Sequence, residues 1–211
     1  MKKIRYSFVL LLFTLLAFSL SAQNANEVVR EMIAILEKTA VSAQYTLSVQ
    51  EQGTNFPQIY RGNFLMFGDK FRLQADGLDA RYDGKTQYIY MEQMDELSIS
   101  EPTDEELLQV NPILMAKTMF VTCDMRFIQT SNSAAIYHVE FIPKEKGSEV
   151  ELLTLKIRKS DKMLTQVTLV SSQGIVSELG LTQQKTSVST HDVDFVIGEN
   201  DYPGAFVNDL R

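Results

Sequence analysis

The spacing of apolar residues changes once along the chain. Between residues 24 and 40 they recur at the spacing of one helical face, with Asn26 as a candidate N-cap. From Ala43 onward, apolar and polar residues alternate one by one in about eleven short stretches. A period of two gives a strand one apolar and one solvated face, as in an antiparallel sheet. The pattern predicts an N-terminal amphipathic helix followed by a long antiparallel sheet.

One segment, residues 102–120, interrupts the strand pattern. Thr103 and Glu106 have the spacing of a capping box, and Asn111 followed by Pro112 is typical of the start of another short helix. These helices would carry many apolar residues, namely Leu107, Leu108, Val110, Ile113, Leu114, Met115, Met119 and Phe120. So much apolar surface predicts that the helices cover the apolar side of the sheet.

The predicted fold class is therefore α+β, mostly β. A sheet of this many twisted strands curls, and helices over its concave face enclose either a filled core or a ligand cavity. Both interpretations remain open, although several methionines would suit ligands of variable shape. The strand residues expected to share the concave face are Phe64, Met66, Phe71, Leu73, Tyr88 and Tyr90. The last predicted strand carries Val193, Phe195 and Ile197.

The tripeptide Gly84-Lys85-Thr86 is the ending of a nucleotide-binding P-loop. Such a loop needs a glycine where this chain has Asp79, and it opens a helix. Residues 87–90 are instead aromatic and β-branched, which favours a strand. An Asp-Gly pair between two strands indicates a hairpin turn, because glycine tolerates a positive φ.

The N-terminus changes the expected location of the protein. Residues 1–22 combine a basic start, an apolar run over residues 8–20 and small residues, which is the pattern of a secretory signal peptide. We expect cleavage after Ser21 or Ala22, leaving residues 23–211 as one exported domain. The chain has 20 basic and 27 acidic residues, and three basic residues leave with the signal peptide, so the mature net charge is −10. Such a chain repels nucleic acid and anionic membranes.

The sequence lacks the usual patterns of catalytic and metal sites. His138 and His191 are far apart, and no metal-binding or nucleophile motif surrounds them. Cys123 is the only cysteine, which excludes an intrachain disulfide and favours a small buried apolar residue. We therefore expect a protein that is not an enzyme and that needs no metal or cofactor.

Several stretches, in this order and spacing, resemble one known family. They are residues 62–66 (GNFLM), 70–73 (KFRL), 83–90 (DGKTQYIY), 111–114 (NPIL) and 141–144 (FIPK), followed by the region of Phe195. Together they are similar to the LolA family of periplasmic carriers, which move lipoproteins from the inner to the outer membrane. The similarity runs over nearly the whole chain after the signal peptide. One departure is Gly68-Asp69, where the family usually has an Arg-Pro whose arginine holds the lid; another is the absence of tryptophan, with Leu73 and Tyr88 in its place.

The resemblance implies an unclosed, curled β-barrel with short helices as a lid over a hydrophobic cavity for acyl chains. It implies a monomeric periplasmic carrier, with an inner-membrane lipoprotein-releasing ABC transporter and an outer-membrane receptor as partners. A LolA-like lipid or lipoprotein sensor in envelope stress regulation is the alternative. The expected lipid-contacting residues are Tyr45, Leu47, Phe64, Met66, Phe71, Leu73, Tyr88, Tyr90, Leu97, Ile99, Leu107, Leu108, Ile113, Leu114, Met115, Met119, Leu155 and Ile157.

Overall fold

The computed structural model describes residues 24–103, 106–107, 112–128, 134–145, 147, 150–198 and 200–211, with the backbone alone for residues 112 and 113. The expected signal peptide, residues 1–22, lies outside this part. Among the described residues, no helix is both long enough and apolar enough to cross a membrane.

About half of the described residues belong to twelve strands of one sheet. The strands are β1 (Val41–Gln50), β2 (Gln58–Phe67), β3 (Lys70–Ala75), β4 (Leu78–Tyr82), β5 (Gln87–Met91), β6 (Glu96–Ser100), β7 (Cys123–Phe127), β8 (Ile136–Pro143), β9 (Val150–Arg158), β10 (Leu164–Ser171), β11 (Val176–Thr186) and β12 (Phe206–Asp209). The helical elements are α2 (Ala25–Lys38), α4 (Pro112–Thr122) and the 3-10 turn η2 (Asp192–Phe195).

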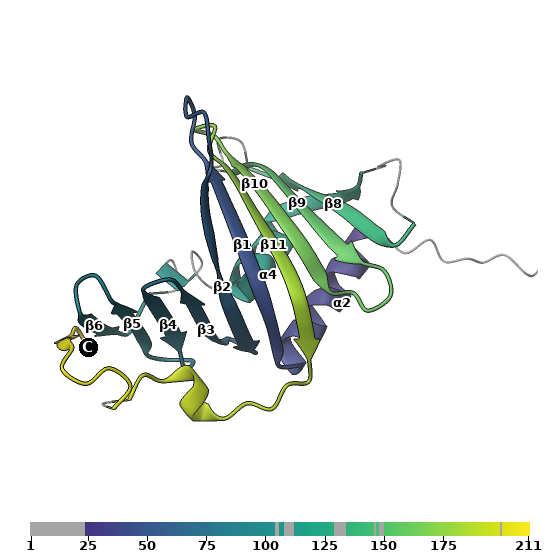
Figure 1. The fold of residues 1–211 in the computed structure, drawn as a ribbon. Helices are drawn as coiled ribbons and strands as arrows, with labels where there is room; N and C mark the ends of the chain where they lie inside the picture. The colour runs from purple at the N-terminus through teal and green to yellow at the C-terminus, as the bar shows by residue number, and fades with distance from the viewer. Residues whose placement is uncertain are drawn as a thin grey trace, which may run out of the picture.

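The sheet is long, curled and not closed. Its order is β12-β6-β5-β4-β3-β2-β1-β11-β10-β9-β8-β7, and every pair is antiparallel except β12 with β6. Figure 1 shows strands β2, β1, β11, β10, β9 and β8 curving around α2 and α4, while β3 to β6 project away from the helices. We call β3 to β6 with β12 the wing. The predicted fold class, a mostly β protein with an unclosed curled sheet and helices on one side, is confirmed.

Helix α2 fills one end of the concave face. Its periodic apolar residues Val28, Val29 and Met32 are at most 1% exposed and belong to the main core cluster. The helix begins at Ala25, so the N-cap is Asn24, whose side-chain oxygen accepts a hydrogen bond from the Glu27 N–H at 2.8 Å. The prediction of Asn26 as the cap was wrong, because Asn26 already lies in the first turn.

One predicted hairpin turn and one predicted helix cap have the expected local hydrogen bonds. In the hairpin between β4 and β5, Gly84 has a φ of +102°, and the Asp83 carboxylate accepts the N–H groups of Lys85 and Thr86. A strand follows this turn rather than a helix, so the hairpin interpretation is confirmed. Thr103 and Glu106 form the predicted capping box, with Glu106 accepting the Thr103 N–H at 2.8 Å.

The strand expected around Phe195 was wrong. After β11 the chain leaves the sheet, forms η2 against β3, and reaches β12 at the edge of the wing (Figure 1). Within this segment, Phe195 and Ile197 are buried, whereas Val193 is 74% exposed. The alternation thus reflects a tail lying across a face of the sheet, which gives the same period as a paired strand.

Candidate functional site

The concave face is filled where the helices cover it. Val139, Phe141, Leu155 and Ile157 on β8 and β9 are between 0% and 5% exposed and pack in one cluster with α2. Two of them, Leu155 and Ile157, are among the predicted lipid-contacting residues. In this half, the filled-core interpretation describes the structure.

The concave face of β1 to β5 is covered less completely. Strand register places Met66, Phe71 and Tyr82 side by side on this face, and all three are buried. Tyr45, opposite Gly62 on the same face, is buried too. Their neighbours on this face are only partly buried: Leu47, Phe64, Leu73, Leu78, Ala80, Ile89 and Met91. These seven side chains form a continuous half-buried apolar surface, which we call the open face.

Register contradicts the predicted orientation of four aromatic and aliphatic residues. Phe71 lies opposite Tyr82 in β4, but Tyr88 of β5 lies opposite Arg81 and Tyr90 opposite Asp79. Opposed residues point to the same side of a sheet, so both tyrosines face the convex side. Leu97 and Ile99, which pair with Tyr90 and Tyr88, also face this side.

The error arose at the turn between β4 and β5. The sequence pattern offered two apolar sets on β5, one with Tyr88 and Tyr90 and one with Ile89 and Met91. A shift of one residue exchanges the faces of a strand, and the aromatic set was assigned to the wrong one. The concave residues of β4 and β5, among them Ile89 and Met91, were therefore missed. The length of the turn from Asp83 to Thr86 separates the two sets, because it places Gln87 opposite Tyr82 and so puts Ile89 and Met91 on the concave side.

Helix α4 lies beside α2, β7 and β8, and it is apolar on nearly all sides. Leu114, Met119 and Phe120 contact the main core cluster, yet no side chain from residue 114 to residue 122 is fully buried, and Val121 is 71% exposed. Of the other predicted helical residues, Leu107 is buried and Met115 is partly buried. Leu108 and the side chain of Ile113 lie outside the described residues.

Two side-chain contacts connect α4 to α2. Lys117 pairs with Glu37 at 2.5 Å, and the Arg30 guanidinium lies 5.6 Å from the centre of the Phe120 ring. Partly exposed ion pairs and cation–π contacts each contribute about 0.5–1 kcal/mol. Gly68, where the LolA family usually has the lid arginine, forms the turn between β2 and β3 with a φ of +62°. The two polar contacts from α4 to α2 are thus weak, while its apolar side chains pack on the core cluster and the Val121 carbonyl accepts a hydrogen bond from the Lys144 Nζ at 2.9 Å.

The convex face of the wing holds a buried polar cluster under the C-terminal segment. Arg81 donates to Asp79 at 2.7 Å and to the Val196 carbonyl at 2.6 Å, while Tyr202 donates to Asp79 at 2.9 Å. The Tyr202 ring stacks on Tyr90 with centroids 3.6 Å apart. These contacts fix the C-terminal segment to the face that carries Tyr88, Tyr90, Leu97 and Ile99.

The pKa values of Asp79 and Tyr202 in this cluster are both displaced. Burial raises the pKa of Asp79, but hydrogen bonds from Arg81 and Tyr202 outweigh burial, so the pKa is lowered overall. Burial, followed by the hydrogen bond to the Asp79 carboxylate, raises the pKa of Tyr202 to about 12. The cluster is therefore ionised as a paired Asp–Arg unit at neutral pH, and these contacts are structural ones.

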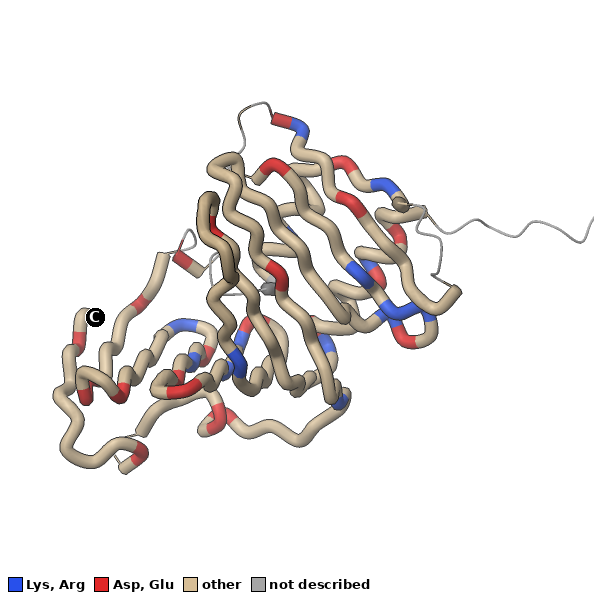
Figure 2. The backbone as a smooth tube through the Cα atoms, turned by 45° about the horizontal axis from the view of Figure 1, so that its top comes forward, with Lys and Arg blue, Asp and Glu red and all other residues tan. Residues whose placement is uncertain are grey.

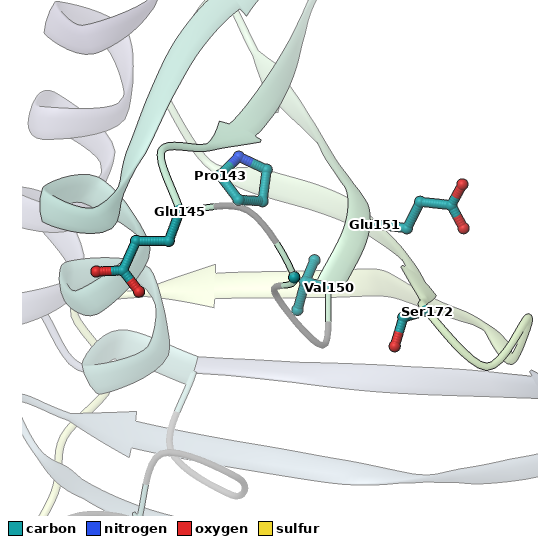
Figure 3. Close-up of a pocket in the computed structure, with 6 residues that line it drawn as sticks. Pro143, Glu145, Val150, Glu151 and Ser172 are labelled. Carbon is teal, nitrogen blue, oxygen red and sulfur yellow. The ribbon is translucent and has the colours of Figure 1, made fainter.

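The remaining candidate groups are separate from one another. In the described part of the chain, no three His, Cys, Asp or Glu side chains come close enough to hold a metal ion. Cys123 is buried, and burial lowers the pKa of His138. A pocket of about 430 Å³ lies where β8 leads toward β9, but its two carboxylates, Glu145 and Glu151, point in opposite directions (Figure 3). That pocket cannot bring both acids to one ligand atom.

Comparison with known proteins identifies the fold. No protein-family model and no curated protein matches the sequence. An uncharacterised conserved protein from Thermus thermophilus matches over 88% of this chain and 98% of its own, with 14% identity and a TM-score of 0.57. MucB matches over 82% of this chain and 62% of its own, with 11% identity and a TM-score of 0.50.

The fold is LolA-like. A LolA superfamily protein from Nitrosomonas europaea also matches, over 83% of this chain and 99% of its own, with 12% identity and a TM-score of 0.44. The unclosed, curled sheet with helices on one side agrees with the fold that the sequence resemblance implied. At these identities a LolA-like fold does not decide which ligand the concave face binds, and that question depends on the open face and on α4.

Proposed function

We propose that this protein is a periplasmic carrier that binds the acyl chains of lipoproteins on the open face and takes them from the inner to the outer membrane. The observation that carries the proposal is helix α4. It is apolar on nearly all sides, none of its described side chains is fully buried, and it lies beside α2, β7 and β8 on the concave side of the sheet, the side that also carries the open face. An apolar helix in this state gains further burial when an acyl chain enters beside it.

The energies suit reversible binding. Burial of an acyl chain contributes about 0.8 kcal/mol per CH₂ group, or roughly 10 kcal/mol for one long chain. The two contacts between α4 and α2 together contribute on the order of 1–2 kcal/mol. A bound chain that displaces α4 must also replace the packing of Leu114, Met119 and Phe120 on the core cluster, which its own apolar surface can supply, and release requires no covalent step. Short helices depend on docking for their stability, which fits a movable lid.

The other parts of the proposal follow from export. The signal-like residues 1–22 would direct the chain to the periplasm, where an inner-membrane lipoprotein-releasing ABC transporter supplies the cargo and an outer-membrane receptor accepts it. The acidic mature chain would stay soluble beside anionic lipid surfaces. In this proposal the protein acts as a monomer without cofactor or catalysis.

A matched pair of substitutions on α4 tests the proposal. Met119 is partly buried against the core cluster, whereas Val121 lies in the same last turn and is 71% exposed. Met119→Asp would place a charge against an acyl chain, and an unpaired buried charge is costly. We expect Met119→Asp to bind a fluorescent fatty acid at least about tenfold more weakly than Val121→Asp, which is a difference of about 1.4 kcal/mol.

Melting curves of both variants identify any loss of folding, and native mass spectrometry of periplasmic material identifies co-purifying lipoprotein. Equal binding by two folded variants would contradict a lipid path beside α4. A protein that retains a labelled lipoprotein but never transfers it to acceptor vesicles would favour the sensor alternative instead.

A further inference from the structure

The outermost strand of the wing, β12, has one edge without a neighbouring strand in the described sheet. It runs parallel to β6, and the N–H groups of Phe206 and Leu210 donate to main-chain carbonyls of Asp95 and Ile99, each at 2.8 Å. In a parallel pair, alternate residues bond to the same neighbour. The main-chain groups of Val207 and Asp209 therefore face away from β6, where another strand could pair with them.

The same edge exposes large apolar side chains. Phe206 is 67% exposed, Val207 54% and Leu210 66%, and Met94 in the turn before β6 is 57% exposed. We call β12 with Met94 and Leu210 the docking edge. The opposite edge strand of the sheet, β7, exposes the charged residues Asp124 and Arg126, and its apolar residue Phe127 is only 37% exposed. Charged side chains protect edges from pairing, so the docking edge is the more apolar and less protected of the two.

The charge of the chain is concentrated around the docking edge. Residues 84–103 and 192–211 contain nine acidic and two basic residues, an excess of seven negative charges within the mature net charge of −10, although Asp192 and Asp201 pair with Lys70 and Arg81. Both basic residues are paired, Lys85 with Glu101 at 2.9 Å and Arg211 with Asp209 at 2.6 Å. Figure 2 shows the acidic residues spread along the wing and the C-terminal segment. The apolar edge thus lies in an acidic field.

We propose that the docking edge binds an extended, basic segment of a partner protein, which adds to the sheet beside β12. Main-chain bonds to Val207 and Asp209 would provide affinity, as in other cases of strand addition. Apolar residues at alternate positions of the partner would line one face and cover Val207, which points to the opposite face from Phe206, and lysine or arginine would complement the acidic surroundings. A second copy of this chain would bring the same acidic groups together, which disfavours self-pairing.

This surface is separate from the open face. The docking edge lies at the outer end of the wing, five strands beyond β2 and two strands beyond β5, the outermost strand of the open face, whereas α4 contacts β7 and β8 near the other end of the sheet. The proposal therefore stands or fails independently of acyl-chain binding, and a partner could hold the wing while the concave face is loaded.

Fluorescence anisotropy with two labelled peptides tests the proposal on the full mature chain. One short peptide alternates lysine with valine, and the other alternates glutamate with valine. We expect the lysine peptide to bind, with an affinity that falls as salt rises, and the glutamate peptide to bind at least about tenfold more weakly. Val207→Pro removes an outward N–H group while leaving the bonds to β6. It should therefore lower the affinity for the lysine peptide about tenfold.

Val193→Ser is the control, because Val193 is 74% exposed in the same acidic C-terminal segment but lies outside β12. It should bind as the parent does, whereas Val207→Ser should bind more weakly. The proposal is overturned if the two peptides bind equally, if Val207→Pro binds as well as the parent, or if a fluorescent fatty acid displaces the lysine peptide. It is also overturned if the protein alone dimerises and Val207→Pro abolishes the dimer, because the edge would then be an interface between copies.

Discussion

Replacing Arg81 with methionine tests how the wing is held together. Arg81 is 6% exposed and Asp79 3%, and their nearest charged atoms are 2.7 Å apart. At an effective dielectric constant of about 20, this distance corresponds to roughly 6 kcal/mol of attraction, which largely offsets the cost of desolvating both groups. Arg81→Met removes the attraction but leaves the Asp79 charge buried. Arg72 at 3.6 Å and the Tyr202 hydroxyl remain as its partners.

We expect Arg81→Met to lower the free energy of unfolding by about 3–5 kcal/mol. The Val196 carbonyl also loses its 2.6 Å donor, so the C-terminal segment should become a site of early proteolysis. Urea denaturation measures the loss of stability. Limited proteolysis, together with hydrogen exchange of residues 192–209, measures the loosening of the C-terminal segment. The double variant Asp79→Leu with Arg81→Met should be more stable than Arg81→Met alone, since it leaves no buried charge.

Lys85→Met is the control for loss of a cation from the same wing. The Lys85 side chain is 77% exposed, so solvent screens its pairing with Glu101 and the pair contributes little to stability. If Arg81→Met costs no more than Lys85→Met, the buried cluster does not hold the C-terminal segment, and the reasoning on burial fails.

Two further predictions concern local backbone geometry. A Cβ atom at Gly62 would lie 1.8 Å from the Gln74 carbonyl oxygen, so Gly62→Ala should prevent close pairing of β2 and β3 and yield little folded protein, as an expression and melting assay would reveal. Asn24→Ala should cost about 1 kcal/mol of stability in urea denaturation because it removes the cap of α2, whereas Asn26→Ala should change stability by less than half as much.

The sequence predicts those elements whose apolar period is unambiguous. The amphipathic pattern of α2 identifies its buried face, and the Asp-Gly pair at residues 83–84 identifies the hairpin, because each signal is local. The capping box of Thr103 and Glu106 is local in the same sense. The curled sheet follows from the number of strands and their alternation, so the fold class needs no further information.

Sequence reasoning failed where a pattern had two physical causes. On β5 both parities are apolar, since one face packs on the concave side and the other is covered by the tail through Tyr202. Around Phe195 the period of two comes from a tail over the sheet. The buried Asp79–Arg81 pair gave no signal, because two charges at alternate positions are typical of an exposed strand face until a distant segment covers them. Such coverage is long-range and cannot be read from local spacing.

The hydrogen bond from Tyr202 to Asp79 should make stability depend on pH in the alkaline range. The folded-state pKa of Tyr202 is about 12, above the ordinary value of 10. Below pH 10 the hydroxyl keeps its proton in both states and the contribution is fully present. As the pH rises toward 12, the unfolded chain loses this proton first, so the folded state loses its advantage, by at most about 3 kcal/mol and by less where solvent screens the pair.

Urea denaturation of the parent and of Tyr202→Phe, measured from about pH 9 to about pH 12, isolates this effect, because other titrating groups cancel in the difference. The parent should lose stability relative to Tyr202→Phe only above pH 10. Asp79 should make stability depend on pH in the acidic range. Its lowered pKa gives stability that is present above its unfolded pKa of about 3.9 and is lost as the pH falls further. A difference that stays constant through the alkaline range would mean that Tyr202 does not donate to Asp79 in solution, and that Tyr202 contributes to holding the tail only by stacking on Tyr90.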